Sequence, residues 1–396
     1  MLRSIQIKNF KAIADSGKVE LTPLTVFVGH NGSGKSSILE ALEFFQRYAL
    51  HGLDEAIGPW YNIDHILWQG HDRAQPYATA LFYPHPLEMT IRGVLKNQWI
   101  AKMRLGILTQ DTEIQKAKSL SQKTELYSLH RQFSRTRRTD GRVDEHEYRG
   151  AYKNAHIKLD PDESLFGIDM THGADRWMFL SLDPLSIGQP RVRRGGGHDI
   201  RLNRTGENLS TFLLSFLEKD PDGFNSMIES LRYILPYVAD LRPEVVRDIV
   251  ESRTLLRLTE GFANGTHAHL PGWVLSGGTL RLLAILAALR HPDAPQVLCI
   301  DELENGLDPR AIGFLVDEIR YAIKEPERQV LATTHSPYLL DKLSLDHIVT
   351  VERENGGPPV FRRPAKDDHL KQWAERFAPG SLYTMGLYRN RKEGGK

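Results

Sequence analysis

The sequence contains little cysteine, no long hydrophobic run and almost no net charge. Of its 396 residues only Cys299 is a cysteine, so neither an intramolecular disulfide nor a cysteine-based metal cluster can form within the chain. That scarcity favours a reducing compartment, and we predict a cytoplasmic protein. Apolar runs such as residues 282–289 are far shorter than the roughly 20 residues that span a bilayer, so we expect no membrane-crossing segment.

The charge is balanced, with 51 Lys and Arg against 50 Asp and Glu, which gives a net charge of +1. This balance argues against a protein whose whole surface coats nucleic acid, but it leaves room for a local basic patch. Hydrophobic residues make up 40% and charged residues 26% of the chain, which excludes wholesale disorder, a collagen repeat and a disulfide scaffold. The length allows two or three domains, or one elaborated α/β unit. The first eight residues alternate apolar and polar types, unlike a secretory signal.

Several segments have the hydrophobic periodicity of strands or helices. We predict strands over residues 24–28, 254–258, 296–300 and 329–333, a β-rich stretch over 77–108, and helices over 36–48, 208–217, 224–234, 276–289 and 309–323. In the last third of the chain the strands alternate with helices, which predicts a parallel, doubly wound sheet of the α/β class. There is no internal repeat and no sustained heptad pattern of a coiled-coil arm.

A glycine-rich loop lies between the first predicted strand and the first predicted helix. It fits the pattern that cradles phosphate groups, and the candidate residues are Gly29, His30, Asn31, Gly32, Ser33, Gly34, Lys35, Ser36 and the adjoining Ser37. Glycines let the backbone wrap around a phosphate chain, and successive N–H groups at a helix start bind the anion. Lys35 is expected to reach the terminal phosphates, and the Ser36 hydroxyl to bind Mg²⁺. The loop therefore predicts nucleotide binding.

An apolar strand over residues 297–300 ends in two acids, Asp301 and Glu302. In a doubly wound sheet the carboxyl ends of the strands line the ligand crevice. We predict that Asp301 holds Mg²⁺ through its water shell and that Glu302 is the general base for an attacking water. His335 follows the next strand, so it is expected at the same sheet edge, within reach of a γ-phosphate.

A second helix start also offers an anion site. Ser276, Gly277 and Gly278 open the predicted helix 276–289, where backbone N–H groups and the helix dipole attract anions. One chain does not need two sites for one γ-phosphate. These residues are therefore expected to complete the nucleotide pocket of a partner subunit, in a two-fold symmetric dimer with two ATP molecules at the interface. Asp308 is a candidate for communication across that dimer.

Together these motifs resemble the ABC-type ATPases, and within them the soluble heads of the SMC, RecF and OLD-like class. The resemblance covers residues 2–48 and 272–343, and includes the phosphate loop, signature, acid strand, D-loop and H-loop in the family's order. It implies ATP hydrolysis with ATP and Mg²⁺ as cofactors. It also implies that Lys11 approaches the nucleotide and that Gln69 is a Q-loop sensor of Mg²⁺ and water. Thr279 departs from the usual glutamine of the signature.

The roughly 240 residues between Lys35 and Ser276 exceed what a compact nucleotide-binding domain needs. We therefore predict an N-terminal half of the head with a β-rich subdomain (1–108), an inserted or helical middle region (109–270), and a C-terminal half with a tail (271–396). Two arginine clusters of the middle region could contact DNA, RNA or a partner protein, and they include Arg135, Arg137, Arg138, Arg193 and Arg194. Phe133 or Trp177 could stack on bases. Alternatively, the clusters are solvated loops or pair with nearby acids.

These features predict an ATP-hydrolysing switch in which two heads close on two ATP molecules and reopen after hydrolysis. The leading interpretation is a bacterial phage-defence or toxin-type system, in which the dimer, or a higher oligomer, regulates a separate nuclease or toxin subunit. The alternative is a RecF-like repair factor that binds DNA directly. A transporter motor is disfavoured by the middle insert, and a nucleotide-locked scaffold without turnover is the remaining hypothesis.

Overall fold

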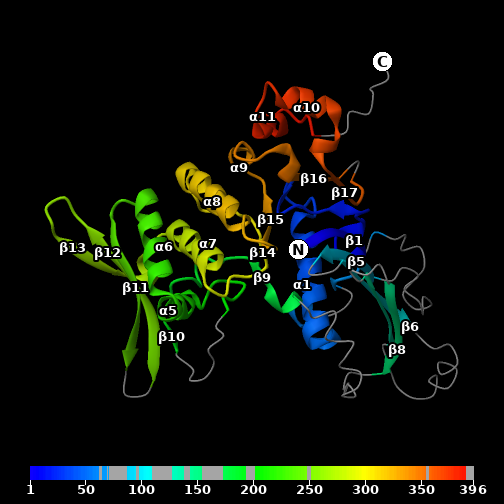
Figure 1. Cartoon of the computed structure of the whole chain (residues 1–396), viewed down its shortest axis with the longest axis horizontal. Helices are drawn as coiled ribbons and strands as arrows, with labels where there is room; N and C mark the ends of the chain where they lie inside the picture. Colours follow the sequence, from blue (N-terminus) through cyan, green and yellow to red (C-terminus); the bar gives the residue numbers. More distant parts are fainter. Residues whose placement is uncertain are drawn as a thin grey trace. The chain divides into compact units, whose positions relative to one another are not determined.

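The computed structural model describes residues 1–61, 65–68, 70, 87–94, 98–108, 127–137, 143–153, 173–192, 201–247, 251–353 and 356–388. The fold is α/β, the class predicted from the sequence, with parallel strands flanked by helices (Figure 1). The chain forms two compact units, each built from segments that are distant in the sequence. The first unit comprises residues 1–22, 27–175 and 349–364, and the second comprises 23–26, 176–348 and 365–396.

The first unit contains a seven-stranded antiparallel sheet. Its strands are β1 (Leu2–Phe10), β2 (Ile13–Asp15), β3 (Val19–Glu20), β5 (Leu87–Val94), β6 (Gln98–Leu108), β7 (Tyr127–Arg137) and β8 (Val143–Lys153). They run in the order β2-β1-β5-β6-β7-β8, with β3 also paired to β1. β7 and β8 lie beyond residue 108 and continue the sheet that begins at β1.

Strand β4 (Leu24–Val28) leads into the glycine-rich loop and helix α1 (Lys35–His51). Every side chain of β4 is buried, as its β-branched and aromatic residues require. A glycine with a positive φ lies at each end of α1, Gly34 with φ 105° and Gly52 with φ 87°, and glycine adopts this backbone conformation more readily than other residues. An aromatic cluster holds α1 on the first unit, with the rings of Phe10 and Phe44 6.0 Å apart and that of Trp60 5.9 Å from Phe44.

The second unit is built on three parallel strands, β9 (Trp177–Leu180), β14 (Val297–Ile300) and β15 (Gln329–Thr334). β14 lies in the middle, and the register pairs Ile300 with Leu180 on one side and with Ala332 on the other. All side chains of β14 and β15 are buried, which is typical of parallel strands covered on both faces. Trp177 is only 6% exposed in β9, so the prediction that it stacks on bases is wrong; it is a core residue.

A second sheet of the same unit is antiparallel. It contains β10 (Arg191–Val192), β11 (Val238–Arg247), β12 (Ser252–Gly261) and β13 (His267–Pro271), and β12 pairs with the other three. Helices α5 (Leu209–Lys219) and α6 (Pro221–Ile234) pack against it. Helix α5 also packs against a buried histidine: the ring of His291 stacks on that of Phe212, with centroids 4.5 Å apart.

Helix α7 (Gly277–Arg290) precedes β14 in the sequence, and helix α8 (Pro309–Ala322) connects β14 to β15. The two helices pack against each other. The remaining elements are α2 (Leu53–Ile57), α9 (Pro337–Leu340), β16 (Ile348–Arg353), β17 (Pro359–Arg362), α10 (Asp368–Ala374), α11 (Pro379–Thr384), and the 3₁₀ turns Gly58–Trp60, Ala174–Arg176, Gly272–Val274, Leu345–His347 and Pro364–Lys366. Each individually predicted helix and strand has a counterpart, displaced by a few residues at most where its ends differ. β12, for example, begins two residues before and ends three residues after the predicted strand 254–258.

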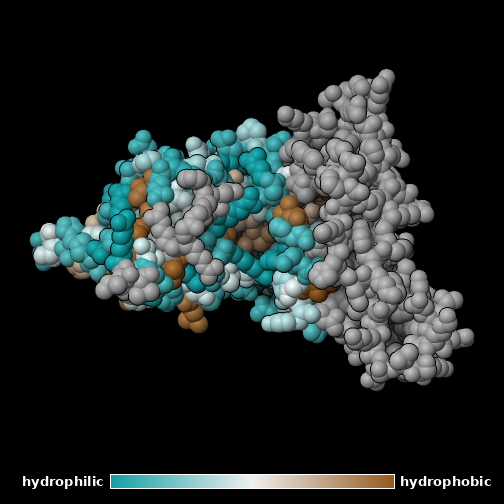
Figure 2. All heavy atoms as spheres, turned by 90° about the horizontal axis from the view of Figure 1, so that it is seen from below, coloured by the Kyte–Doolittle hydropathy of each residue, from teal (hydrophilic) through white to brown (hydrophobic). Residues whose placement is uncertain are grey.

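No helix among the described residues is both long enough and apolar enough to cross a bilayer. On the face in Figure 2, hydrophilic side chains dominate the described surface and the hydrophobic ones are scattered. Isolated apolar side chains are normal on protein surfaces, so this face by itself identifies no docking site.

Candidate functional site

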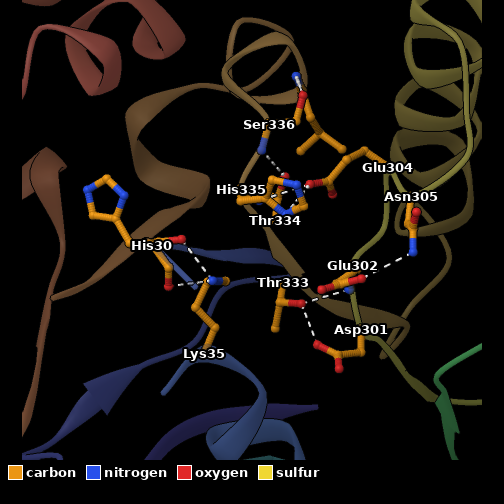
Figure 3. A network of polar contacts seen from close by, with 12 residues as sticks. His30, Lys35, Asp301, Glu302, Glu304, Asn305, Thr333, Thr334, His335 and Ser336 are labelled. Atoms are coloured by element: carbon orange, nitrogen blue, oxygen red, sulfur yellow. Dashed lines mark hydrogen bonds and ion pairs between the residues drawn. The ribbon is translucent and has the colours of Figure 1, made fainter. Parts of the chain in front are cut away.

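The glycine-rich loop of the first unit joins the end of β4 to the start of α1. Lys35 is the first residue of α1, and its side chain is only 7% exposed. Its Nζ donates to the carbonyl oxygens of Gly29 and His30, at 2.8 and 2.9 Å (Figure 3). The ammonium group is therefore held inside the curve of the loop, where the helix start also directs its N–H groups.

Two glycines of this loop leave no room for a side chain. A Cβ on Gly29 would lie 2.1 Å from the carbonyl oxygen of Val351, and a Cβ on Gly34 would lie 2.7 Å from Pro359. Gly34 also has φ 105°, which L side chains rarely adopt. The Ser33 hydroxyl is buried and makes no hydrogen bond in the structure. A tight backbone loop with a buried polar group to satisfy fits the binding of a phosphate chain.

Lys11 lies beside α1 rather than in the glycine-rich loop. It has φ 47°, and its backbone N–H donates to the carbonyl of Ile66. Its Nζ is 2.6 Å from Oε2 of Glu40 and 5.8 Å from the centre of the Trp60 ring. The side chain is thus fixed by an ion pair and a cation–π contact in the first unit. Its predicted approach to the nucleotide stays a prediction.

The two acids that follow β14 lie in a network with Thr333, at the end of the neighbouring strand β15 (Figure 3). The Thr333 hydroxyl donates to Oδ1 of Asp301 at 2.6 Å and accepts from the backbone N–H of Glu302 at 2.8 Å. Thr333 is fully buried, whereas both acids are partly exposed. Parallel strand ends therefore bring Asp301 and Glu302 to one edge of the sheet, as the sequence predicted for strand-end residues.

Glu302 has a strained backbone conformation. Its φ of 50° places a non-glycine residue in the left-handed region, at a cost of about 1–2 kcal/mol. The surroundings compensate: its N–H is bound by Thr333, its carbonyl accepts from Arg281, and its carboxylate accepts from Asn305 at 3.2 Å. Such strain persists only where contacts over-determine it, so the direction of the Glu302 side chain is built into the fold.

Arg281 is the buried residue that sequence reasoning missed. It lies on α7, is 2% exposed, and donates to the carbonyl oxygens of Leu182 and Glu302 at 2.6 and 2.8 Å. Burial lowers the pKa of its guanidinium from the ordinary value, and the negative charges of three acids, foremost Glu302, oppose that effect. An arginine stays protonated in a protein, so it supplies a fixed positive charge behind the acids. Only an unusual Arg in an otherwise apolar helix signalled this role in the sequence.

His335 lies at the same edge of the sheet, as predicted. Its backbone N–H and its ring Nδ1 both contact Oε1 of Glu304, at 2.9 and 3.2 Å (Figure 3). The His335 side chain is 49% exposed, whereas that of Glu304 is 7% exposed. Glu304 is a second residue that the sequence analysis did not single out. Its partner His335 is 31 residues further along the chain, so the sequence around Glu304 gave no sign of the contact.

The signature residues begin helix α7. Ser276 is its N-cap, and its hydroxyl accepts from the Thr279 N–H at 3.1 Å and contacts the Thr279 hydroxyl at 2.7 Å. Thr279, at the position of the usual signature glutamine, therefore contributes its N–H and its hydroxyl to the N-cap interaction with Ser276. Ser276 is exposed. Asp308 is likewise exposed, and it caps α8 by accepting from the N–H groups of Arg310 and Ala311.

Gly278 is in close contact with the turn that follows the acids. A Cβ at this position would lie 2.2 Å from the carbonyl oxygen of Gly306, so backbone would have to move. We expect Gly278→Ala to lower the free energy of unfolding by about 1–3 kcal/mol through overpacking, measured by denaturant unfolding. The matched control is Gly313→Ala inside α8, where the new Cβ meets only the flexible end of Lys342 at 3.8 Å. That change should stabilise the protein by about 0.4–1 kcal/mol. Equal effects of the two substitutions would contradict the contact.

Some predicted residues cannot be placed in a site. Gln69, Arg138, Arg193 and Arg194 lie outside the described residues, and of Arg135 and Arg137 the structure describes only the backbone, in β7. Three other arginines of the second cluster, Arg191, Arg201 and Arg204, are described. Of these, Arg191 donates to Oε2 of Glu207 at 2.6 Å. At this arginine the structure favours pairing with an acid over a free basic patch.

Across the described part of the chain, no three His, Cys, Asp or Glu side chains gather as a metal site. Mg²⁺ in nucleotide sites is held by one or two protein groups together with substrate phosphates, so a dedicated cluster is not needed. Asp301, whose carboxylate is positioned by Thr333, and the Ser36 hydroxyl at the start of α1 have the oxygen chemistry that Mg²⁺ prefers.

One known protein family matches most of this chain. The family described as "AAA domain, putative AbiEii toxin, Type IV TA system" matches residues 24–341. The match covers most of the chain, so the protein belongs to this family. It runs from β4 through the signature and the acid strand to the turn after His335. The predicted membership of an ABC-type ATPase head class is thereby confirmed. No curated protein is significantly similar in sequence.

Solved structures with a similar fold include SMC heads. One, described as "Crystal structure of the SmcHead bound to the C-winged helix domain of ScpA", is 17% identical with a TM-score of 0.49, and the match covers 92% of this chain and 98% of that one. The SMC head domain from Thermotoga maritima is 12% identical with a TM-score of 0.40, covering 91% and 98%. An Smc head with an extended coiled coil bound to the C-terminal domain of ScpA, derived from Pyrococcus furiosus, is 12% identical with a TM-score of 0.45, covering 95% and 100%. These likenesses are too distant to say more about this chain.

Proposed function

We propose that the protein is an ATP-hydrolysing switch. The observation that carries the proposal is the family match, which spans both the phosphate loop and the strand with the two acids. The ordered contacts around Glu302 and His335 support it, because catalytic groups need fixed directions. The direct test is phosphate release by the purified protein with ATP and Mg²⁺. A protein that binds ATP without turnover would be the nucleotide-locked scaffold instead.

Each part of the site has a role in this proposal. Lys35 and the loop N–H groups bind the terminal phosphates of ATP. Ser36, Asp301 and Gln69 would hold Mg²⁺, which would supply positive charge to the phosphates. Glu302 accepts a proton from the attacking water, and His335 assists at the phosphate. The Arg281 guanidinium keeps the backbone of Glu302 in place, so the carboxylate does not need to reorganise before it acts.

The proposal includes a dimer. The exposed signature at the start of α7 is suited to meet the nucleotide of a second copy, in a homodimer with two ATP molecules between the heads, or in a higher oligomer built from such dimers. In this proposal Asp308, exposed at the start of α8, senses contact with the second head. Hydrolysis then cleaves the γ-phosphate from the ATP that joins the heads, leaving ADP and phosphate, and the subunits separate.

The biological role that we propose is regulation of a separate effector in a bacterial phage-defence or toxin-type system, in the cytoplasm. The support is the family's own description, which names a putative AbiEii toxin and a type IV toxin–antitoxin system. A pull-down from the native host with and without ATP tests this role. A nuclease or toxin that is retained only with ATP would support it, and recovery of the chain alone would not.

Direct binding of DNA, as in a RecF-like repair factor, is the second candidate. It is favoured by strand β7, which carries Arg131, Arg135 and Arg137 on an antiparallel hairpin with β8. If it is correct, replacing these three arginines with glutamine should weaken ATP-dependent DNA binding and reduce the slope of log K against log salt by about 3, near one unit for each phosphate that is no longer neutralised. Fluorescence anisotropy with duplex DNA at several salt concentrations measures this slope. An unchanged slope would mean that these arginines do not contact DNA phosphates and are instead solvated or in contact with a partner protein.

A further inference from the structure

Glu304 has the environment of a residue retained for a purpose other than stability. Its side chain is 7% exposed, and its Oε1 accepts a hydrogen bond from the backbone N–H of His335 and lies 3.2 Å from the ring Nδ1 of the same residue. The other oxygen, Oε2, is buried and makes no hydrogen bond in the structure. Burying a carboxylate with half of its acceptors unused costs free energy, and an apolar residue would avoid that cost. The contacts it does make therefore indicate its role.

Both contacts of Glu304 fix the same residue. The bond to the backbone N–H, at 2.9 Å, sets the position of the chain at His335, and the contact with Nδ1, at 3.2 Å, sets the orientation of the ring. A carboxylate can only accept, so this close contact favours a proton on Nδ1. In neutral imidazole the remaining nitrogen, Nε2, then has a free lone pair.

We propose that Glu304 is a positioning residue that holds His335 in the Nδ1–H form and presents Nε2 to the substrate. The inference rests on the proposed function for the role of His335, but the position of the ring beside Glu304 stands on the contacts alone. It links the turn after β14 to the turn after β15, so the acid strand and the histidine are held as one piece of the second unit. Glu304 itself does not contact the substrate.

The first test is spectroscopic and needs no ATP hydrolysis. The full-length protein is labelled with ¹⁵N-histidine, and the His335 signals are identified by their loss in His335→Asn. At a pH about two units above the ordinary imidazole pKa of ~6.5, long-range ¹H–¹⁵N spectra should show the Nδ1–H tautomer of His335. Glu304→Gln keeps an acceptor oxygen and should keep this tautomer. Glu304→Ala should give a mixture of tautomers.

The second test separates binding from turnover. We expect Glu304→Ala to lower kcat for ATP about 10- to 100-fold, the effect of a misplaced catalytic group, with the Kd for ATP unchanged and with most activity restored in Glu304→Gln. Glu304→Asp keeps the charge but shortens the side chain, and serves if the alanine variant does not fold. The matched control is Glu318→Ala, which removes a partly buried carboxylate bound to Arg290 and should affect stability only.

Two outcomes would overturn the proposal. One is an unchanged His335 tautomer in Glu304→Ala, and the other is a glutamine variant as impaired as the alanine variant in both measurements. A wild-type protein without ATP turnover would instead refute the proposed function, while the spectra would still decide whether Glu304 sets the tautomer of His335.

Discussion

Replacing Lys35 with alanine is expected to abolish ATP binding at ordinary nucleotide concentrations. The Lys35 ammonium is the buried positive charge of the glycine-rich loop, where the carbonyl oxygens of Gly29 and His30 hold it. Hydrogen bonds to charged groups contribute about 1.5–3 kcal/mol each, so removing two hydrogen bonds to phosphate oxygens should weaken binding by roughly 3–6 kcal/mol, or at least about 100-fold. Titration calorimetry with ATP and Mg²⁺ measures the change.

Two controls make the Lys35 result specific. Lys18→Ala removes an exposed lysine of the same unit that pairs only loosely with Glu20, at 3.9 Å, and should leave ATP affinity unchanged. Thermal unfolding of Lys35→Ala in the absence of nucleotide shows whether the loop keeps its structure, because the variant also frees two carbonyl oxygens. A folded Lys35→Ala variant with wild-type affinity would refute the assignment of this loop to nucleotide binding.

Replacing Glu302 with glutamine should stop turnover while preserving the site. Glutamine has nearly the same shape, so the backbone contacts with Thr333 and Arg281 are kept, and its amide oxygen can still accept from Asn305. It cannot take a proton from water, and removing a general base typically costs 10²- to 10⁴-fold in rate. We therefore expect phosphate release to fall about 100-fold or more, with the Kd for ATP within a few-fold of wild type.

The same variant should accumulate the ATP-bound dimer, because hydrolysis is the step that separates the heads. Light scattering coupled to size exclusion, with and without ATP, measures the dimer fraction. Glu325→Gln, at an exposed position just after α8, is the control and should behave like the wild type in both assays. A Glu302→Gln protein that still hydrolyses ATP at near wild-type rate would assign the general base elsewhere. Loss of hydrolysis without a longer-lived dimer would contradict the switch.

The motifs that carry chemistry could be read from the sequence because their function depends on local order. The glycine-rich loop, the capped start of α7 and the acids after β14 are each defined within a few consecutive residues. Buried parallel strands and amphipathic helices leave strong periodic signals, so β4, β14, β15 and α8 were found near their observed positions. By contrast, β7 and β8 are polar, and their residues contain little sign that they continue the N-terminal sheet.

The residues that orient the acids could not be found in this way. Arg281 lies in an apolar helix, Glu304 in a turn and Thr333 at a strand end, and their partners are between 21 and 99 residues away in the sequence. Trp177 was misread for the same reason. Its strand β9 pairs with β14, about 120 residues further along the chain, and only that pairing makes the tryptophan a core residue.

The sequence by itself determined the family, the α/β class and the identity of the phosphate loop and the two acids, because these depend on residue type and spacing along the chain. Only the tertiary structure decided how the acids are held. Parallel pairing brings the ends of β14 and β15 together, so Thr333 can bridge Asp301 and Glu302 and Glu304 can reach His335. With a single cysteine the chain has no internal disulfide to hold these residues, so hydrogen bonds and packing do so. The residues that form those contacts become neighbours only when the chain folds.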